Sequence, residues 1–225
     1  PMVQSHAGTL RPPSLHDLRA DGERLAEALE KQHGLTVTGI DLDALREISP
    51  TLRAHVDPEE GDWCIRVATR RGEVIGLLPP EAAPLGLAVD LGTTKIAAYL
   101  VDLTSGRTLG SQGRMNPQIA YGEDVVARIT LAEQGEAKRL LLRQLVVTAI
   151  NEAASELCAE AHAEPSHVVD MVVVGNTAMH HLFLGLPVRQ LALAPYVPAV
   201  ASALDVKARD LGLRLAPGAY VHLLP

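Results

Sequence analysis

A turn rich in glycine and threonine carries the clearest chemical signal in this chain. Gly92-Thr93-Thr94 follows an apolar strand that reaches Asp90, and a second apolar strand begins at Lys95. The backbone N–H groups of such a turn stay unpaired and point one way, so they and the threonine hydroxyls can donate hydrogen bonds to a phosphate. Asp90 can hold Mg²⁺ through its waters, since this ion usually takes only one or two protein carboxylates. These residues predict a phosphate loop in which Asp90 is the metal-binding residue and a catalytic residue.

Two alternatives stay open at this turn. Ordinary hairpin turns also favour residues such as glycine, without any ligand. The Lys95 ammonium can reach the terminal phosphate of a nucleotide, or it can point into solvent from the second strand. We therefore count Lys95 among the candidate cofactor-binding residues, below the three residues of the turn.

A second turn, Gly175-Asn176-Thr177, follows the apolar run 168–174. Open α/β sheets bind ligands at the carboxyl ends of such strands, so Asn176 and Thr177 are predicted to bond a nucleotide phosphate or to orient the attacking water. Capping of the next helix by either residue explains the pattern equally well. Of the adjacent His180 and His181, only one can face a given site, because neighbours on a helix point about 100° apart. Ordinary hydrogen-bonded histidines are the favoured interpretation of this pair.

A third polar cluster consists of Asn116, Gln118, Tyr121 and Asp124. In a half-domain of the fold to which these residues point, the loop after the third strand lies beside the nucleotide cleft or faces a partner. Gln118 is therefore predicted to position a water or a metal-bound water, which makes it a second catalytic candidate. The alternative is that the acidic residues beside it only cap the next helix, where the helix dipole favours negative charge.

The loop from Asp90 to Thr94 resembles the first phosphate motif of the acetate and sugar kinase, Hsp70 and actin superfamily. Three further segments, residues 116–124, 174–181 and 194–198, resemble the ATP-dependent reductive activators of corrinoid proteins. This resemblance implies ATP and Mg²⁺ as cofactors, and an ATPase activity that drives reduction of a Co(II) corrinoid to Co(I). The partner implied is a corrinoid protein or a cobalamin-dependent methyltransferase. The alternatives are a small-molecule kinase of the same fold and an Hsp70-like module that nucleotide only switches.

The first part of the chain is predicted to hold a linker and a small α+β domain. Residues 1–13 lack periodicity and are interpreted as a mobile linker, and residues 14–84 as a middle domain that acts as a spacer or in dimerisation, giving a homodimer. Prolines mark its end and suggest that residues 14–80 fold independently. The expected elements are a helix over 14–33, a strand over 35–40, a helix over 41–55 interrupted near Pro50, and a hairpin over 63–78 whose turn carries two solvated arginines, Arg70 and Arg71.

Residues 85–225 are predicted to form an α/β domain with a mixed sheet. The expected elements are strands over 85–91, 95–101 and 107–115, helices over 123–133 and 136–161, and a buried strand over 168–174. With the resemblance, this order implies the first RNase H-like half of an actin-like ATPase domain. No second phosphate loop or adenosine motif occurs in the sequence, so the second half is expected to lie outside this chain.

Composition limits the function classes. A net charge of −7, with one Trp, four Tyr and one Phe, disfavours nucleic-acid binding. The two cysteines, Cys64 and Cys158, form no ligand motif, so the [2Fe–2S] cluster that the resemblance implies is expected only in an N-terminal domain not present in this chain. No apolar run of about 18 residues or more and no signal peptide occur, which predicts a cytoplasmic protein without a membrane span.

Overall fold

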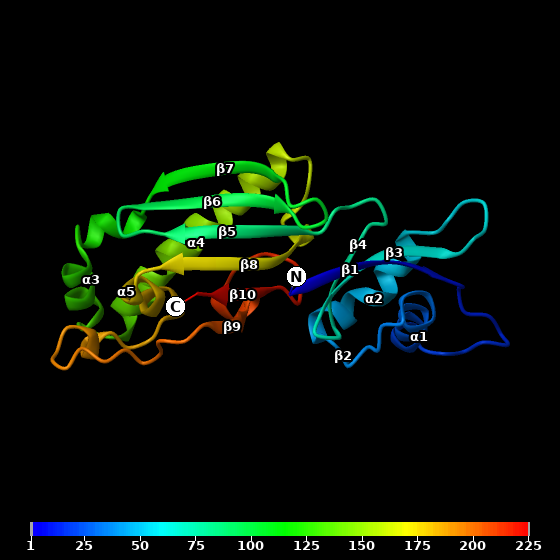
Figure 1. Ribbon diagram of the computed structural model, residues 1–225, viewed down its shortest axis with the longest axis horizontal. Helices are drawn as coiled ribbons and strands as arrows, with labels where there is room; N and C mark the ends of the chain where they lie inside the picture. Colours follow the sequence, from blue (N-terminus) through cyan, green and yellow to red (C-terminus); the bar gives the residue numbers. More distant parts are fainter. Residues whose placement is uncertain (1, 225) are drawn as a thin grey trace.

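The computed structural model describes residues 2–224, which form two lobes arranged along the long axis of the molecule (Figure 1). The first lobe has a four-stranded sheet of order β1-β3-β4-β2, and the second has a six-stranded sheet of order β7-β6-β5-β8-β10-β9. The strands of the second lobe are β5 (Leu85–Leu91), β6 (Lys95–Asp102), β7 (Thr108–Met115), β8 (Val168–Gly175), β9 (Leu204–Lys207) and β10 (Tyr220–Leu223).

The second sheet has the mixed topology expected of an RNase H-like half-domain, and the predicted α/β fold class is confirmed. β5, β6 and β7 form an antiparallel meander, whereas β8 runs parallel to β5 on its other side and β10 parallel to β8. β9 closes the edge antiparallel to β10. Because β5 and β8 are parallel neighbours, their carboxyl ends meet at one edge of the sheet.

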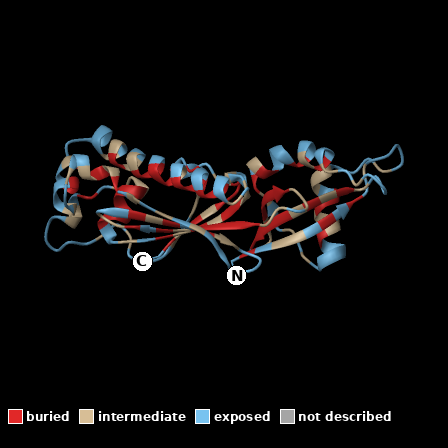
Figure 2. Cartoon of the chain, turned by 90° about the horizontal axis from the view of Figure 1, so that it is seen from above, coloured by how far each residue is buried: buried red, intermediate tan, exposed pale blue. Residues whose placement is uncertain are grey.

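The long helix α4 (Glu136–Glu160) covers one face of this sheet, as its apolar stripe predicts. Leu142, Val146, Ile150 and Leu157 of this stripe are buried in the core. The helices of both lobes line one side of the molecule, and buried residues concentrate beneath them (Figure 2). The remaining helices of this lobe are η1 (Pro117–Tyr121), α3 (Val125–Ala132), η2 (Pro165–His167), α5 (Thr177–Leu184), η3 (Arg189–Leu191) and η4 (Ala208–Leu211).

The prediction of a mobile linker over residues 1–13 is wrong. β1 (Val3–Leu10) is an edge strand that pairs antiparallel with β3 along its whole length, from Val3 opposite Arg70 to Leu10 opposite Trp63. The polar residues between buried Val3 and Leu10 hide the strand pattern, because backbone pairing rather than side-chain burial holds most of this edge. The other elements of the first lobe are α1 (Asp21–His33), β2 (Gly39–Ile40), α2 (Leu42–Ala54), β3 (Trp63–Arg70) and β4 (Glu73–Leu78).

Three expected boundaries in the first lobe also change. The helix predicted over residues 14–33 begins only at Asp21, because Asp17 and Ser14 exchange backbone hydrogen bonds in a turn and buried Arg24 donates to the Asp17 carboxylate at 2.7 Å. The strand predicted over residues 35–40 is shorter in the structure, where β2 covers only Gly39–Ile40.

The helix α2 continues through Pro50 without the predicted interruption, and Ile48 and Leu52 are buried on either side of it.

The hairpin of β3 and β4 is confirmed, but its first arginine is not a solvated turn charge. The Arg70 side chain is 3% exposed and donates to Asp205 of β9 at 2.6 Å. Its guanidinium also lies over the Tyr220 ring, 4.3 Å from the centroid. Only Arg71, whose side chain is 77% exposed, fits the prediction. Arg70 therefore belongs to the contact between the lobes.

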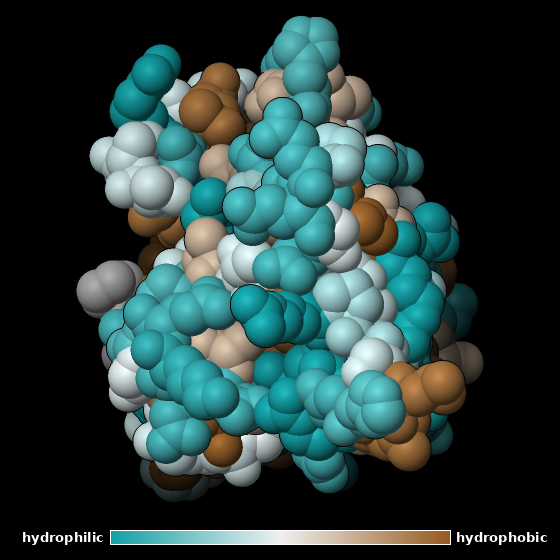
Figure 3. All heavy atoms as spheres, turned by 90° about the vertical axis from the view of Figure 1, so that its right-hand side faces the viewer, coloured by the Kyte–Doolittle hydropathy of each residue, from teal (hydrophilic) through white to brown (hydrophobic). Residues whose placement is uncertain are grey.

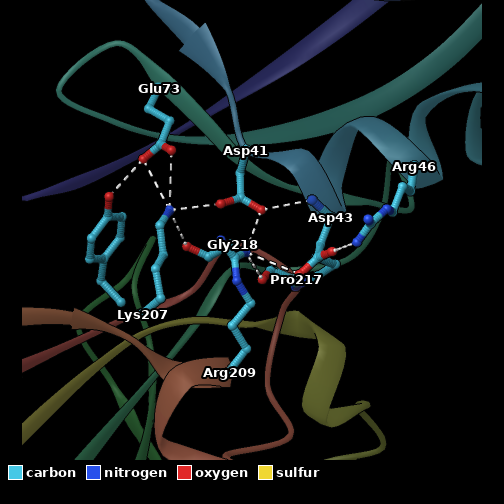
Figure 4. A network of polar contacts seen from close by, with 9 residues as sticks. Asp41, Asp43, Arg46, Glu73, Lys207, Arg209, Pro217 and Gly218 are labelled. Carbon is cyan, nitrogen blue, oxygen red and sulfur yellow. Dashed lines mark hydrogen bonds and ion pairs between the residues drawn. The ribbon is translucent and has the colours of Figure 1, made fainter.

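A network of charged side chains joins the two lobes (Figure 4). Asp41, which caps α2, accepts from Arg209 at 2.7 Å and pairs with Lys207 at 3.0 Å, and both basic residues come from the second lobe. Lys207 also pairs with Glu73 of β4 at 3.1 Å, and the Tyr220 hydroxyl donates to the same carboxylate at 2.9 Å. The Asp41 side chain is 2% exposed, so this network is part of the interior.

The backbones of the lobes also touch. Gly218 donates to the Ile75 carbonyl at 2.8 Å, and a side chain at position 218 would place its Cβ 2.6 Å from that oxygen. Ile75 and Leu78 of β4 belong to the same apolar core as the second sheet. The sheet of residues 14–80 thus takes one strand, β1, from outside that segment, and β4 joins the core of the second lobe, although most apolar residues of the first lobe form a core of their own. Independent folding of residues 14–80 stays a prediction.

The free end of the first lobe is mainly hydrophilic, with small separate apolar patches (Figure 3). Within residues 2–224, no helix has both the length and the apolar character needed to cross a bilayer.

The junction leads to a prediction about pH. Burial acts to raise the pKa of Asp41, but hydrogen bonds from Arg209 and Lys207 outweigh it and lower the pKa to about 2. A carboxyl group with a lowered pKa in the folded state stabilises the fold above its ordinary pKa and loses this contribution as pH falls from about 4 to about 2. Asp41→Asn is therefore expected to lower the free energy of unfolding by about 2–3 kcal/mol at pH 7.

Urea denaturation followed by Trp63 fluorescence, at pH 7 and at pH 3 or below, measures this difference. Asp43→Asn is the matched control, because Asp43 is more exposed and meets Arg209 at 3.2 Å from the rim of the network. The role given to the Asp41 charge would be contradicted if Asp41→Asn lowered the free energy of unfolding equally at both pH values. An equal decrease in Asp43→Asn would also contradict it.

Candidate phosphate-binding site

The structure brings the two predicted turns together at the carboxyl edge of the central strands. Leu91 at the end of β5 lies opposite Gly175 at the end of β8 in the parallel register. The Asn176 side-chain amide donates to the Thr93 hydroxyl at 3.2 Å. The expectation that both turns face the same edge is confirmed, and eight candidate residues, Asp90 and Lys95 included, lie at or beside this edge.

The carbonyl groups of the first turn are held from inside the protein. Asn116 donates from its side chain to the Gly92 carbonyl at 2.9 Å and from its backbone to the Thr94 carbonyl at 2.9 Å. Arg128 donates to the Thr93 carbonyl between them at 2.7 Å. In a trans peptide the N–H points opposite to the carbonyl. The N–H groups of Thr93 and Thr94 therefore point away from the protein, and neither donates a hydrogen bond within residues 2–224.

Two glycines allow this close arrangement. A Cβ atom at position 92 would lie 2.5 Å from the Lys95 carbonyl oxygen, and one at position 175 would lie 2.9 Å from the Leu91 carbonyl oxygen. Any residue with a side chain at position 92 would push the turn open, because the atom that its Cβ would meet is a backbone oxygen that cannot rotate away. The tight turn thus requires glycine at position 92, and the free N–H groups of Thr93 and Thr94 beside it are donors of the kind that bind a phosphate.

Asp90 and Lys95 share one face of the sheet. Asp90 pairs with Ala97 across the strands, and Lys95 lies two residues before Ala97, so both side chains project to the same side. Both are exposed, and neither forms an ion pair in the described part of the chain. Residues 2–224 contain no group of three or more His, Cys, Asp or Glu side chains arranged around a metal. A single free carboxylate is what Mg²⁺ bound to a nucleotide needs from a protein.

The prediction that Gln118 positions a catalytic water is wrong. Its side chain is fully buried, its amide donates to the Leu142 carbonyl at 2.9 Å, and its oxygen accepts from Arg128 at 3.2 Å. Both polar atoms are therefore used within the protein. The alternative interpretation of this segment holds in part, because Asp124 caps α3 by accepting from the Ala127 N–H at 2.7 Å.

Asn176 is a helix cap, the alternative offered for the second turn, and it also bonds the first turn. Its oxygen caps α5 by accepting from the Met179 N–H at 3.0 Å, while its amide reaches Thr93. His181 is an ordinary hydrogen-bonded histidine: one ring nitrogen contacts the Thr177 carbonyl at 2.7 Å and the other accepts from the Ala199 N–H at 3.0 Å. Burial, with His181 beside it, lowers the pKa of His180, so that ring is neutral near pH 7.

Sequence reasoning missed Arg128 and the function of Asn116. Arg128 occurs in the apolar helix segment VVARITLA, where a lone basic residue at a core position is the signal that was available. Asn116 was predicted only as a member of a polar cluster, with no role of its own, and it is 1% exposed. Both residues support the turn from behind, and neither is at its surface.

The sequence and the fold were also compared with known proteins. A family profile described as RACo middle region matches residues 85–225, and one described as RACo linker region matches residues 1–83. The corrinoid activation enzyme RamQ of Eubacterium limosum is 30% identical over 199 residues, which are 82% of this chain and 34% of that protein.

A solved structure of a reductive activator for corrinoid, iron-sulfur protein aligns with a TM-score of 0.77 and 31% identity, over 100% of this chain and 36% of that one. The chain thus spans about a third of the length of the relatives it matches.

The support from Asn116 can be tested. Asn116→Asp keeps the oxygen that caps η1 but replaces the donor to Gly92 with a second acceptor, which leaves that carbonyl unbonded and repelled. We expect the dissociation constant for Mg-ATP to rise about tenfold or more, the size of one lost hydrogen bond that involves a charge. Isothermal titration calorimetry on the full-length protein measures it.

Asn151→Asp is the control for this change. Asn151 also donates to a backbone carbonyl, that of Gly212 at 3.0 Å, and accepts from a backbone N–H, that of Arg214 at 2.9 Å, but away from the turn. Equal loss of Mg-ATP affinity in both variants would mean that general destabilisation, and not the loop, explains the effect.

Proposed function

The chain belongs to the RACo family, and we propose on that premise that it carries the first phosphate-binding half of an ATPase that drives reductive activation of a corrinoid protein. The observation that supports the nucleotide site best is the turn at residues 92–94, whose carbonyls are all bonded from inside and whose N–H groups face outward. The names of the matched relatives support the corrinoid partner.

In this proposal each residue of the site has a separate task. The N–H groups and hydroxyls of Thr93 and Thr94 bind the phosphates, and Asn176 fixes the Thr93 hydroxyl while Thr177 offers a second hydroxyl from the opposite turn. Asp90 holds the waters of Mg²⁺, and Lys95 offers a positive charge from the same face. ATP hydrolysis supplies the free energy for the unfavourable electron transfer.

The electron itself comes from outside this chain. One electron from a donor reduces Co(II) in the partner to Co(I), while hydrolysis of ATP by water gives ADP and phosphate. Cys64 and Cys158 are both free thiols, and burial raises the pKa of Cys158 to about 11, so it stays protonated and unreactive. We propose that the donor is a [2Fe–2S] cluster in another domain of the full-length protein.

The whole activity is tested by mixing the full-length protein, Mg-ATP, a corrinoid protein in the Co(II) state and a one-electron reductant too weak to act alone. Formation of Co(I), followed by its absorbance, is expected only when ATP and the protein are both present. Co(I) formation at the same rate without ATP would contradict the proposal, as would ATP turnover that leaves the cobalt unchanged.

The assignment of Asp90 makes a sharper prediction. Asp90→Asn keeps the size of the side chain but removes the charge that holds Mg²⁺, so ATP hydrolysis by the full-length protein should fall on the order of 10²-fold or more. The melting temperature should stay the same, because Asp90 is exposed and surface substitutions of this kind change stability little. The rate of ATP hydrolysis and the melting temperature are measured on the same preparation.

Asp102→Asn is the matched control, since Asp102 lies at the opposite end of the same meander and its oxygens accept from Thr104 and Ser105 in a turn. It should hydrolyse ATP at the wild-type rate. Wild-type hydrolysis in Asp90→Asn, or loss of activity together with unfolding, would overturn the assignment.

A further inference from the structure

Arg128 is the largest fully buried side chain in the protein. Its guanidinium donates to the Thr93 carbonyl at 2.7 Å, the Gly122 carbonyl at 2.9 Å and the Gln118 side-chain oxygen at 3.2 Å, and it lies 3.4 Å from the Met179 sulfur. All four partners are uncharged. Arg128 forms no ion pair within the described residues 2–224, unlike Arg24 and Arg70, the other buried arginines.

An unpaired buried cation is costly, because carbonyl dipoles replace only part of its hydration. Burial lowers the pKa of Arg128, and Asp124 opposes this from a distance, but an arginine remains charged near neutral pH. The fold therefore keeps a full positive charge directly behind the turn, where the same side chain is the hydrogen-bond donor to the Thr93 and Gly122 carbonyls.

The geometry of one peptide group shows where this charge acts. The carbonyl of the peptide between Thr93 and Thr94 accepts from Arg128, and the N–H of the same peptide points to the outer side of the turn. A hydrogen bond to the carbonyl polarises the peptide and makes its N–H a stronger donor. An anion bound to this N–H then interacts with Arg128 through a single peptide unit. Because Arg128 lies in the interior, its charge is only weakly screened by solvent.

We infer that Arg128 is a positioning residue that strengthens phosphate binding at residues 92–94 by polarising the Thr93–Thr94 peptide and by supplying the positive charge that balances the bound phosphate. Gln118 and Met179 hold the guanidinium in place. This inference rests on the proposed function, in that it requires a nucleotide phosphate at the turn.

An electrostatic role of Arg128 predicts which ligands lose affinity when the charge is removed. The affinity should fall for ligands that place phosphate charge at the turn, and it should stay unchanged for the part of the nucleotide without phosphate. Removing Arg128 also takes away the donor to the Thr93 and Gly122 carbonyls, so the melting temperature without nucleotide is expected to fall. Arg128→Lys, which keeps the charge, is therefore expected to retain part of the ATP affinity that Arg128→Gln, which keeps only a neutral donor, loses.

The experiment uses Arg128→Met, Arg128→Gln and Arg128→Lys in the full-length protein, with dissociation constants for ATP and adenosine from calorimetry and melting temperatures without ligand. Arg128→Met and Arg128→Gln are expected to bind ATP about 10- to 100-fold more weakly, the size of a lost interaction with a charged group. Adenosine affinity should stay within about twofold, and Arg128→Lys should lie between Arg128→Gln and wild type.

Arg114→Met is the control, because Arg114 is neutralised by Glu152 at 2.9 Å and Glu156 at 2.8 Å; its ATP affinity should match wild type. Equal losses for ATP and adenosine, or unchanged ATP affinity in Arg128→Met, would overturn the inference. If Arg128→Met fails to fold, Arg128→Lys must still bind ATP more tightly than Arg128→Gln, and the reverse order overturns it. If wild type itself binds no ATP, the proposed function fails instead.

Discussion

The support of three carbonyl groups from inside the protein is the constraint on which the candidate site depends. A turn such as 92–94 can present N–H groups outward only if its carbonyls find partners on the other side, since buried carbonyls without partners are costly. Asn116 and Arg128 supply those partners. The path of the chain after β7 follows from this need: η1 and α3 fold beneath the turn and bring both residues to it. The meander, the short helices and the site are therefore one unit.

The second requirement is that two strands end together. β5 and β8 are parallel neighbours, and their ends approach so closely that a Cβ at position 175 would lie 2.9 Å from the Leu91 carbonyl oxygen. The approach lets Asn176 cap α5 and hold Thr93 at the same time. A residue that caps a helix and also binds across to another turn couples the orientation of the helix to the position of the loop. Capping of α5 by Asn176 therefore does not prevent the same side chain from bonding the other turn.

Elements defined by local sequence patterns could be predicted, whereas features that depend on contacts between residues far apart in the sequence could not. The meander, α4 and β8 were predicted almost to the residue, because their apolar periodicity is local and strong. β1 was missed, because an edge strand held by backbone pairing with β3, some 60 residues away, needs little apolar pattern of its own. The burial of Gln118 was missed for the same reason: its hydrogen-bond partners, the Leu142 carbonyl and Arg128, come from helices that only the tertiary fold brings near.

The polar network between the lobes and the polar network around Arg128 differ in charge balance, and this difference indicates what each network does. At the junction of the lobes, Asp41, Asp43 and Glu73 meet Arg46, Lys207 and Arg209, so acids and bases cancel and the network is complete without any ligand. Behind the turn, the Arg128 charge meets only dipoles. A balanced network fixes the register of two surfaces, whereas an unbalanced one keeps an electrostatic potential that an anion can use. The excess positive charge also lies directly behind the outward-facing N–H groups, in agreement with the phosphate site inferred from the backbone alone.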